Sequence, residues 1–137
     1  PKSKLYSSIS YIEYDTNVTV APEDESQYFS LVYPRSSISK YNLSLANSVG
    51  VVDSGYRDTI KERFRYLWQP KDIIASNESK QKEETKFFVQ IDFKKIYKKG
   101  DKIAQLLWAS HNKLYMEFTQ TVPMSERGYE GFGSTGA

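Results

Sequence analysis

The chain has 137 residues, no cysteine and a formal net charge of +2, and 15% of its residues are aromatic. This length supports one domain with a single modest core, and the absence of cysteine excludes disulfides and thiolate metal sites. The small net charge gives no support for nucleic-acid binding, and no stretch approaches the roughly 18 apolar residues that a membrane span needs. No secretory signal pattern occurs, so we expect a cytoplasmic protein that binds neither nucleic acid nor membranes.

Short stretches of alternating polar and apolar residues, separated by turns, indicate an all-β protein. Many short strands of this kind are typical of a barrel or a sandwich. A turn is expected at Lys98–Asp101, and the apolar run that follows predicts a largely buried strand. The strands are expected in pieces over 5–20 and at 28–33, 43–45, 59–67, 87–93, 103–108 and 115–118, with a short helical turn over 36–41.

Residues 68–86 break this pattern, because they are polar and heavily charged and show no apolar period to bury. Such a composition predicts an exposed excursion with at most a frayed helical turn. The glycine-rich last dozen residues predict a mobile tail.

The stretch Val49–Arg57 predicts a tight β-hairpin. An apolar run leads to Asp53, and Ser54-Gly55 then reverses the chain, since glycine is free to adopt a positive φ. Tyr56 follows the tip directly, and residues 59–67 are expected to be the return strand. On this stretch alone, an ordinary surface hairpin is the alternative.

A second stretch suits an oligophosphate. Arg35, Ser36 and Ser37 follow Pro34 and offer a guanidinium fork, two hydroxyls and free backbone N–H groups. The alternative is a helix N-cap beside a surface arginine. Gln105 lies inside an apolar run, where it is either an outward-facing strand residue or a polar ligand.

Four stretches in this order resemble motifs two to five of the trimeric dUTPases, the dUTP nucleotidohydrolases. They are Pro34–Ser37, Asn47–Arg57, Gly100–Gln105 and Arg127–Gly136, and the resemblance runs from about Asp15 to the C-terminus with one insertion. It implies a single dUTPase-like domain over 1–137, a distorted jelly-roll barrel or sandwich. Within it, 68–86 would be a surface insertion and 125–137 a mobile C-terminal lid.

The resemblance also implies an activity, the conversion of dUTP and water to dUMP and pyrophosphate. Asp53 would be the general base for a water that attacks the α-phosphorus. Mg2+ would be held mainly by the triphosphate and waters, so no side chain is expected as a metal ligand. The family forms homotrimers whose sites combine the hairpin of one chain, the phosphate motifs of a second and the tail of a third.

The family's substrate contacts map onto this sequence residue by residue. The phosphates would be held by Arg35, Ser36, less certainly Ser37, and Gln105, with Arg127 at the γ-phosphate. Tyr56 would lie against the deoxyribose, Phe132 would stack on the uracil, and the glycine-rich tail would close over the nucleotide. The residues implied in uracil reading and in lid closure are Asn47, Gly50, Gly133 and Ser134.

Two departures from the family are visible. Its first motif, which supports the magnesium site, has no counterpart, and we expect a segment of roughly 25–35 residues before Pro1, about one strand–turn–strand unit. Asp58 replaces the usual glycine and adds a carboxylate that could raise the pKa of Asp53.

The insertion indicates a phage or viral type of dUTPase, acting in the host cytoplasm. Certain phage dUTPases carry an extra segment in this region that has been linked to partner binding, so 68–86 could bind a protein partner. The resemblance is in position only, and the alternative is a surface loop without a function of its own. Two alternatives therefore stand beside the enzyme: a dUTPase-fold regulatory protein acting through 68–86, and a dCTP deaminase-like enzyme.

Overall fold

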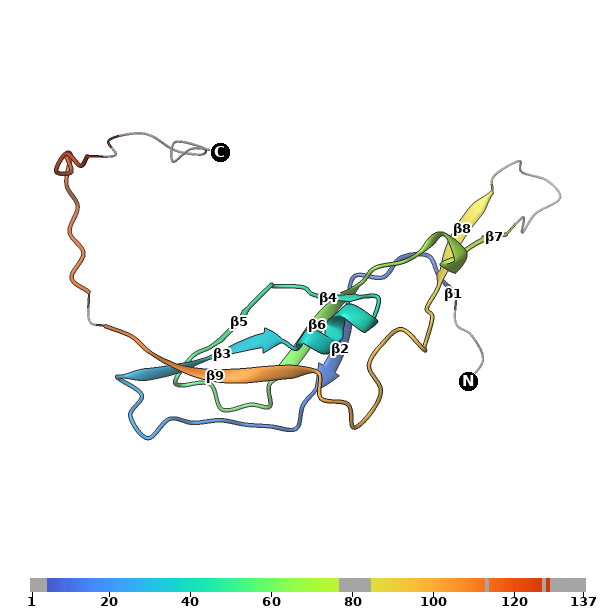
Figure 1. Cartoon of the computed structure of the whole chain (residues 1–137), viewed down its shortest axis with the longest axis horizontal. Helices are drawn as coiled ribbons and strands as arrows, with labels where there is room; N and C mark the ends of the chain where they lie inside the picture. The colour runs from blue at the N-terminus through green and yellow to red at the C-terminus, as the bar shows by residue number, and fades with distance from the viewer. Residues whose placement is uncertain (1–4, 77–84, 113, 127, 129–137) are drawn as a thin grey trace.

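A computed structural model of the chain describes residues 5–76, 85–112, 114–126 and 128. This part contains nine β-strands and two short 3-10 helices, and no α-helix (Figure 1). The strands form three antiparallel sheets, in the orders β1-β8-β7, β2-β6-β4 and β5-β3-β9. Their bounds are β1 Leu5–Tyr6, β2 Ile12–Asp15, β3 Tyr28–Pro34, β4 Leu43–Leu45, β5 Gly50–Val52, β6 Lys61–Tyr66, β7 Ile73–Ser76, β8 Lys86–Gln90 and β9 Ala104–Ser110.

The central strand β6 shows why this sequence forms a half-buried sheet. Side chains of a strand alternate between its two faces, and in β6 Glu62, Phe64 and Tyr66 are buried while their neighbours are exposed. On the solvent face Arg63 lies opposite Glu13 of β2 and forms an ion pair with it at 2.7 Å. The period-two alternation predicted for this region is confirmed in β2 and β6.

The core lies under β4 and β6 and is rich in aromatic side chains. Phe64 is fully buried and makes edge-to-face contacts with the rings of Tyr14 and Tyr97. The distances between ring centroids are 5.7 Å and 5.6 Å. Burying one such side chain stabilises the fold by about 1.5–3 kcal/mol. The buried cluster consists of Leu43, Leu45, Phe64, Tyr66, Ile91, Ile96 and Tyr97.

Strand β3 is the centre of another sheet, between β5 and β9. Its register places Val32 opposite Gly50 of β5 and Leu106 of β9. The helical turn predicted after β3 is confirmed as a 3-10 helix, Ser36–Lys40. The predicted turn at 98–101 is also confirmed, with a hydrogen bond from the Asp101 N–H to the Lys98 carbonyl at 3.0 Å.

The predicted pairing of the hairpin is wrong. The turn itself exists, since the Tyr56 N–H donates to the Asp53 carbonyl at 3.0 Å. However, β5 pairs with β3, whereas β6 pairs with β2 and β4. The connection from Val52 to Lys61 is longer than tight hairpins use, and it carries the chain from one sheet to another. Gly55 is not at a positive φ either.

Two expectations for the C-terminal third are also wrong. The prediction of a largely buried strand fails for β9, because none of its residues is buried and Leu107 and Trp108, on opposite faces of the strand, are 48% and 49% exposed. Residues 115–118 form no strand. The segment 114–126 runs away from the body of the molecule without a partner strand, and Tyr115 and Phe118 are essentially fully exposed (Figure 1).

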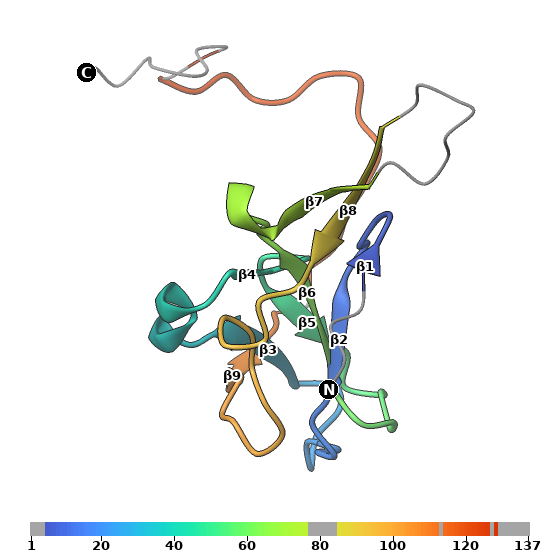
Figure 2. The same cartoon turned by 90° about the vertical axis from the view of Figure 1, so that its right-hand side faces the viewer.

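Residues 68–86 are more ordered than predicted where the structure describes them. The expected helical turn is present as the 3-10 helix η2, Pro70–Asp72, but β7 follows it and pairs with β8. The β7–β8 pair projects from the body beside β1 (Figure 2). Residues 77–84 of this predicted insertion lie outside the described residues. Among the helices described, none has the length and apolar character to cross a membrane.

Candidate functional site

The ends of β3 and β9 bring two of the predicted phosphate ligands together. Pro34, the last residue of β3, pairs with Ala104 at the start of β9. The Gln105 side-chain amide donates to the Pro34 carbonyl at 3.1 Å, immediately before Arg35. Gln105 is exposed, so it is an outward-facing strand residue that also lies beside the arginine.

Arg35 and Gln105 both line a cavity of about 710 Å³. Its walls come from the end of β2, the 98–103 loop and the first residues of β9, and Val32 and Ile60 supply apolar surface. Tyr14 lies in the wall and donates to the Tyr97 carbonyl at 3.1 Å. Burial raises the pKa of Tyr14 to about 12, so its hydroxyl stays protonated at neutral pH.

Glu62 is a site residue that the sequence analysis missed. It lines the same cavity and is only 4% exposed, and its carboxyl group has no hydrogen bond or ion pair within the described part of the chain. Burial raises the pKa of its carboxyl group, because the charged form loses hydration. The alternation of β6, with charged Lys61 and Arg63 on the solvent face, was the signal that could have placed Glu62 inside.

The two serines after Arg35 begin the 3-10 helix. Ser36 is exposed and Ser37 is partly buried. The residue at the N-cap position is Arg35 itself, and its side chain makes no capping hydrogen bond. The alternative of a serine N-cap is therefore wrong, and the serine hydroxyls are not used to cap this turn.

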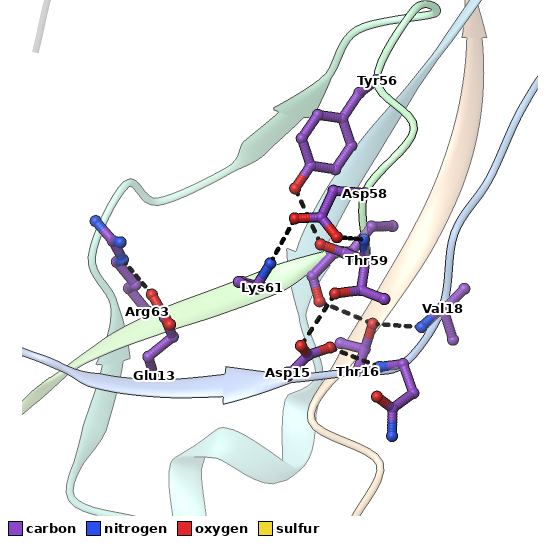
Figure 3. A network of polar contacts seen from close by, with 11 residues as sticks. Glu13, Asp15, Thr16, Val18, Tyr56, Asp58, Thr59, Lys61 and Arg63 are labelled. Carbon is purple, nitrogen blue, oxygen red and sulfur yellow. Dashed lines mark hydrogen bonds and ion pairs between the residues drawn. The ribbon is translucent and has the colours of Figure 1, made fainter.

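The loop after β5 is braced by its own side chains (Figure 3). The Tyr56 hydroxyl donates to the Thr59 carbonyl at 3.0 Å. Arg57 donates to the Ser54 carbonyl at 2.6 Å and forms an ion pair with Glu25 of the preceding loop. These contacts fix the loop that carries Asp53.

The two carboxylates of this loop differ in their surroundings. Asp53 is exposed, and its side chain has no partner among the residues described. Asp58 is bound by Lys61 at 2.8 Å and by the Thr59 N–H at 2.7 Å (Figure 3), and these hydrogen bonds lower its pKa. The expectation that Asp58 raises the pKa of Asp53 stays a prediction.

The segment before β5 brings Asn47 against the backbone of Gly50. Ser48 adopts a positive φ of 62°, and the Val49 N–H reaches back to the Asn47 carbonyl at 2.6 Å. A Cβ added at Gly50 would lie 3.4 Å from the Val32 Cβ and 3.7 Å from the Asn47 side-chain nitrogen. These are ordinary van der Waals distances, so the Gly50 backbone lies in direct contact range of both side chains.

Asp53 and Arg35 lie toward opposite ends of β3. Val52 pairs with Ser30, so Asp53 comes next to Phe29, while Arg35 follows the far end of the strand. Six residues of extended chain at about 3.3 Å each separate the two positions by about 20 Å. Within one chain, the structure thus brings Arg35 to Gln105 but leaves Asp53 distant from both.

The remaining predicted residues, Arg127, Phe132, Gly133 and Ser134, lie outside the described residues. Within the described ranges, no group of three or more His, Asp or Glu side chains is arranged to hold a metal ion. The chain's own donors there do not form a cage for Mg2+.

Known proteins share this sequence pattern and fold. The dUTPase family model matches residues 84–136. The deoxyuridine 5'-triphosphate nucleotidohydrolase of Clostridium acetobutylicum is 34% identical over 116 residues, which cover 84% of this chain and 61% of that protein. The enzyme of the same name from Rickettsia massiliae is 30% identical over 122 residues, covering 88% of this chain and 66% of the relative.

Among solved structures, a dUTPase of Staphylococcus bacteriophage 80alpha with dUpNHpp superposes with a TM-score of 0.66. The two sequences are 24% identical, and the superposition covers 99% of this chain and 82% of the phage protein. This similarity shows the fold. The fold class is therefore all-β and dUTPase-like, as predicted. The chain belongs to the dUTPase family. It spans about three fifths to two thirds of the length of the Clostridium and Rickettsia relatives.

Proposed function

We propose that the protein hydrolyses dUTP to dUMP and pyrophosphate. Family membership supports this reaction, since the relatives in Clostridium and Rickettsia are named as deoxyuridine triphosphate nucleotidohydrolases. One structural observation supports a mechanism with Asp53 as the base. The Asp53 carboxylate is exposed and has no hydrogen-bond or ion-pair partner among the described residues, and Tyr56 and Arg57 brace the loop that carries it.

In the proposed reaction Asp53 accepts a proton from a water molecule. The water oxygen forms a bond to the α-phosphorus, and the bond from that phosphorus to the bridging oxygen breaks, so that pyrophosphate leaves. A base that is already paired with a cation would be a poorer proton acceptor, because the pairing stabilises its charged form. Asp58, bound to Lys61, is such a poorer candidate.

Arg35, Ser36, Ser37 and Gln105 are proposed to hold the phosphates. The contact of Gln105 with the Pro34 carbonyl supports this role, because it keeps the amide beside the guanidinium at the edge of the cavity. A guanidinium binds two phosphate oxygens at once, which fixes orientation as well as charge.

The loop around β5 is proposed to select deoxyuridine. The backbone at Gly50 and the Asn47 side chain lie side by side, so together they offer donors and acceptors to a pyrimidine edge. Tyr56 would lie against the deoxyribose. Arg127, Phe132, Gly133 and Ser134 would close over the nucleotide, with Phe132 on the base and Arg127 at the γ-phosphate.

We infer that each active site combines residues of different chains in a homotrimer. The separation of about 20 Å between Asp53 and Arg35 supports this, because one dUTP molecule cannot have its α-phosphorus beside both. Exposed apolar side chains on β9 and on the 114–126 segment also support assembly, since such surface is normally covered.

Mg2+ is proposed to arrive with the triphosphate and to be held mainly by phosphate oxygens and waters. Mg2+ dehydrates reluctantly and often binds through substrate phosphates rather than through a protein cage. The described residues offer no such cage.

The test is pyrophosphate release from dUTP beside dTTP, dCTP and UTP, for the parent protein and the variant Asp53→Asn. The full-length natural protein is the material to use. Loss of a general base should lower turnover by about 10²- to 10⁴-fold and leave nucleotide affinity within a few-fold. Asp58→Asn is the matched control, because it removes an exposed carboxylate of the same loop and should keep most of the turnover.

Near-parental turnover in Asp53→Asn would remove Asp53 as the base. Release of ammonia from dCTP would identify a dCTP deaminase-like enzyme instead. Binding of dUTP without turnover would favour the regulatory alternative, in which residues 68–86 contact a protein partner. Two exposed apolar side chains favour this second candidate: Trp68, at the start of this stretch before η2, and Phe87 of β8, directly after its end.

A further inference from the structure

Tyr97 packs beside the end of the 3-10 helix that begins at Ser36, because its ring contacts that of the C-cap residue Tyr41. It is 3% exposed, and its ring packs on those of Tyr41 at 4.4 Å and Phe64 at 5.6 Å. Its carbonyl accepts the Tyr14 hydroxyl. The packing and this backbone contact already fix the residue in the core, so its own hydroxyl is not needed to hold it there.

The Tyr97 hydroxyl is the unusual feature. Its oxygen is buried and makes no hydrogen bond with any part of the chain that the structure describes. A buried hydroxyl without a partner costs free energy, and such groups in native proteins call for an explanation. Phenylalanine would fill the same space without that cost.

Two of the proposed phosphate ligands lie close enough to affect this hydroxyl. Burial raises the pKa of Tyr97, while the Ser37 side chain and, more weakly, the Arg35 charge act in the opposite direction. The hydroxyl therefore keeps its proton at neutral pH and can donate it. Ser37 itself is partly buried.

We propose that Tyr97 is a positioning residue that orients Ser37 for phosphate binding. This inference rests on the proposed function. When a phosphate engages the Arg35–Ser37 turn, the Tyr97 hydroxyl donates to the Ser37 oxygen, and the Ser37 proton then points to a phosphate oxygen. A hydroxyl can accept one hydrogen bond while donating another, which makes this chain of two bonds feasible. The cost of the unpartnered hydroxyl in the free protein is then recovered in the complex.

The experiment measures dUpNHpp affinity and unliganded thermal stability for Tyr97→Phe, Ser37→Ala and the double variant. If one hydrogen bond is lost on binding, Tyr97→Phe should weaken dUpNHpp by about five- to tenfold. Without ligand its melting temperature should be unchanged or higher, since no bond is lost. Tyr41→Phe is the matched control, a tyrosine of the same ring cluster, and should bind within about twofold of the parent, as expected for a residue outside the coupled pair.

The double variant separates positioning from packing. If Tyr97 acts through Ser37, the double variant should bind no more weakly than Ser37→Ala alone. Additive losses, or a fall in melting temperature that parallels the loss of affinity, would show a merely structural role and overturn the inference. Unchanged affinity of Tyr97→Phe beside a parent that binds would also overturn it, with the proposed function intact. A parent protein that does not bind dUpNHpp would overturn both.

Discussion

Glu62 is a single residue whose burial destabilises the folded state in a pH-dependent way. Its carboxyl group is buried beside the cavity, and no described cation or donor compensates it. Burial raises its pKa above the ordinary value of 4.5. Below that ordinary value the group is neutral in both the folded and the unfolded chain, and its burial carries no charge penalty. As the pH rises through the raised pKa of the folded state, ionisation favours the unfolded chain, and stability is lost.

We therefore expect Glu62→Gln to stabilise the protein at pH 7 but not at pH 4. The gain in the free energy of unfolding at pH 7 should be about 1–3 kcal/mol, the usual cost of a buried polar group without a partner. Denaturant unfolding at the two pH values measures it. Ser30→Ala is the control, because Ser30 is also buried with an unpartnered hydroxyl but does not titrate. A difference of equal size at both pH values would contradict an ionised Glu62.

At this scale the sequence allows a hypothesis where the functional groups are neighbours in the chain. Arg35, Ser36 and Ser37 could be proposed together because they are consecutive, and Gln105 because an amide stands out in an apolar run. The surroundings of Glu62 and of the Tyr97 hydroxyl could not be predicted. Both depend on which side chains of distant strands fill the space around them, and no local pattern contains that information.

At the scale of elements, a buried polar network joins the predicted insertion to the core. The Tyr66 hydroxyl donates to the Asp72 carboxylate and accepts the Asp92 N–H, both at 2.9 Å. Asp72 also accepts the Gln69 N–H at 2.8 Å, at the start of η2. One hydroxyl thus ties η2, which leads into β7, to the residues that follow β8.

Tyr66→Phe should loosen this connection and leave the other sheets in place. It removes two hydrogen bonds and leaves the partly buried Asp92 N–H and an Asp72 carboxylate oxygen without this partner. The free energy of unfolding should therefore fall by about 1–3 kcal/mol. Amide hydrogen exchange should speed up most in β7 and β8. Tyr11→Phe provides the comparison, because Tyr11 is 46% exposed and its hydroxyl bonds to nothing in the described part of the chain. Equal effects of the two variants would show that the network does not hold the β7–β8 pair.

Strands with a clear alternation of polar and apolar residues were predicted well, but the strands with which they pair were not. The alternation in β2 and β6 and the turn before Tyr56 follow from local rules. The assignment of β6 as the return strand of β5 failed because pairing is decided by register and burial across the sheets. The strand β7 was missed for a similar reason: its charged surroundings indicate exposure, but it pairs with β8, which in turn pairs with β1.

At the scale of the whole molecule, the proposed composite site can be tested by mixing two inactive variants. Asp53→Asn and Arg35→Ala should each be nearly inactive alone. In trimers formed at random from equal amounts, a site has an intact Asp53 with probability one half and an intact Arg35 from its neighbour with the same probability, so about a quarter of the parental activity should return. Co-refolding followed by a pyrophosphate assay measures it. A site contained in one chain would recover nothing.

The length of β3 also bears on how defects in this protein would be inherited. Consider two gene copies expressed together in an enzyme whose sites lie within single chains. Activity remains when one gene copy carries both substitutions, and it is lost when each gene copy carries one of them. In the proposed homotrimer, Asp53 and Arg35 of one chain would serve different sites, and random mixing would then yield about a quarter of intact sites in either case. The cis–trans test of genetics would no longer distinguish the two arrangements, because the unit of function would be the boundary between two chains.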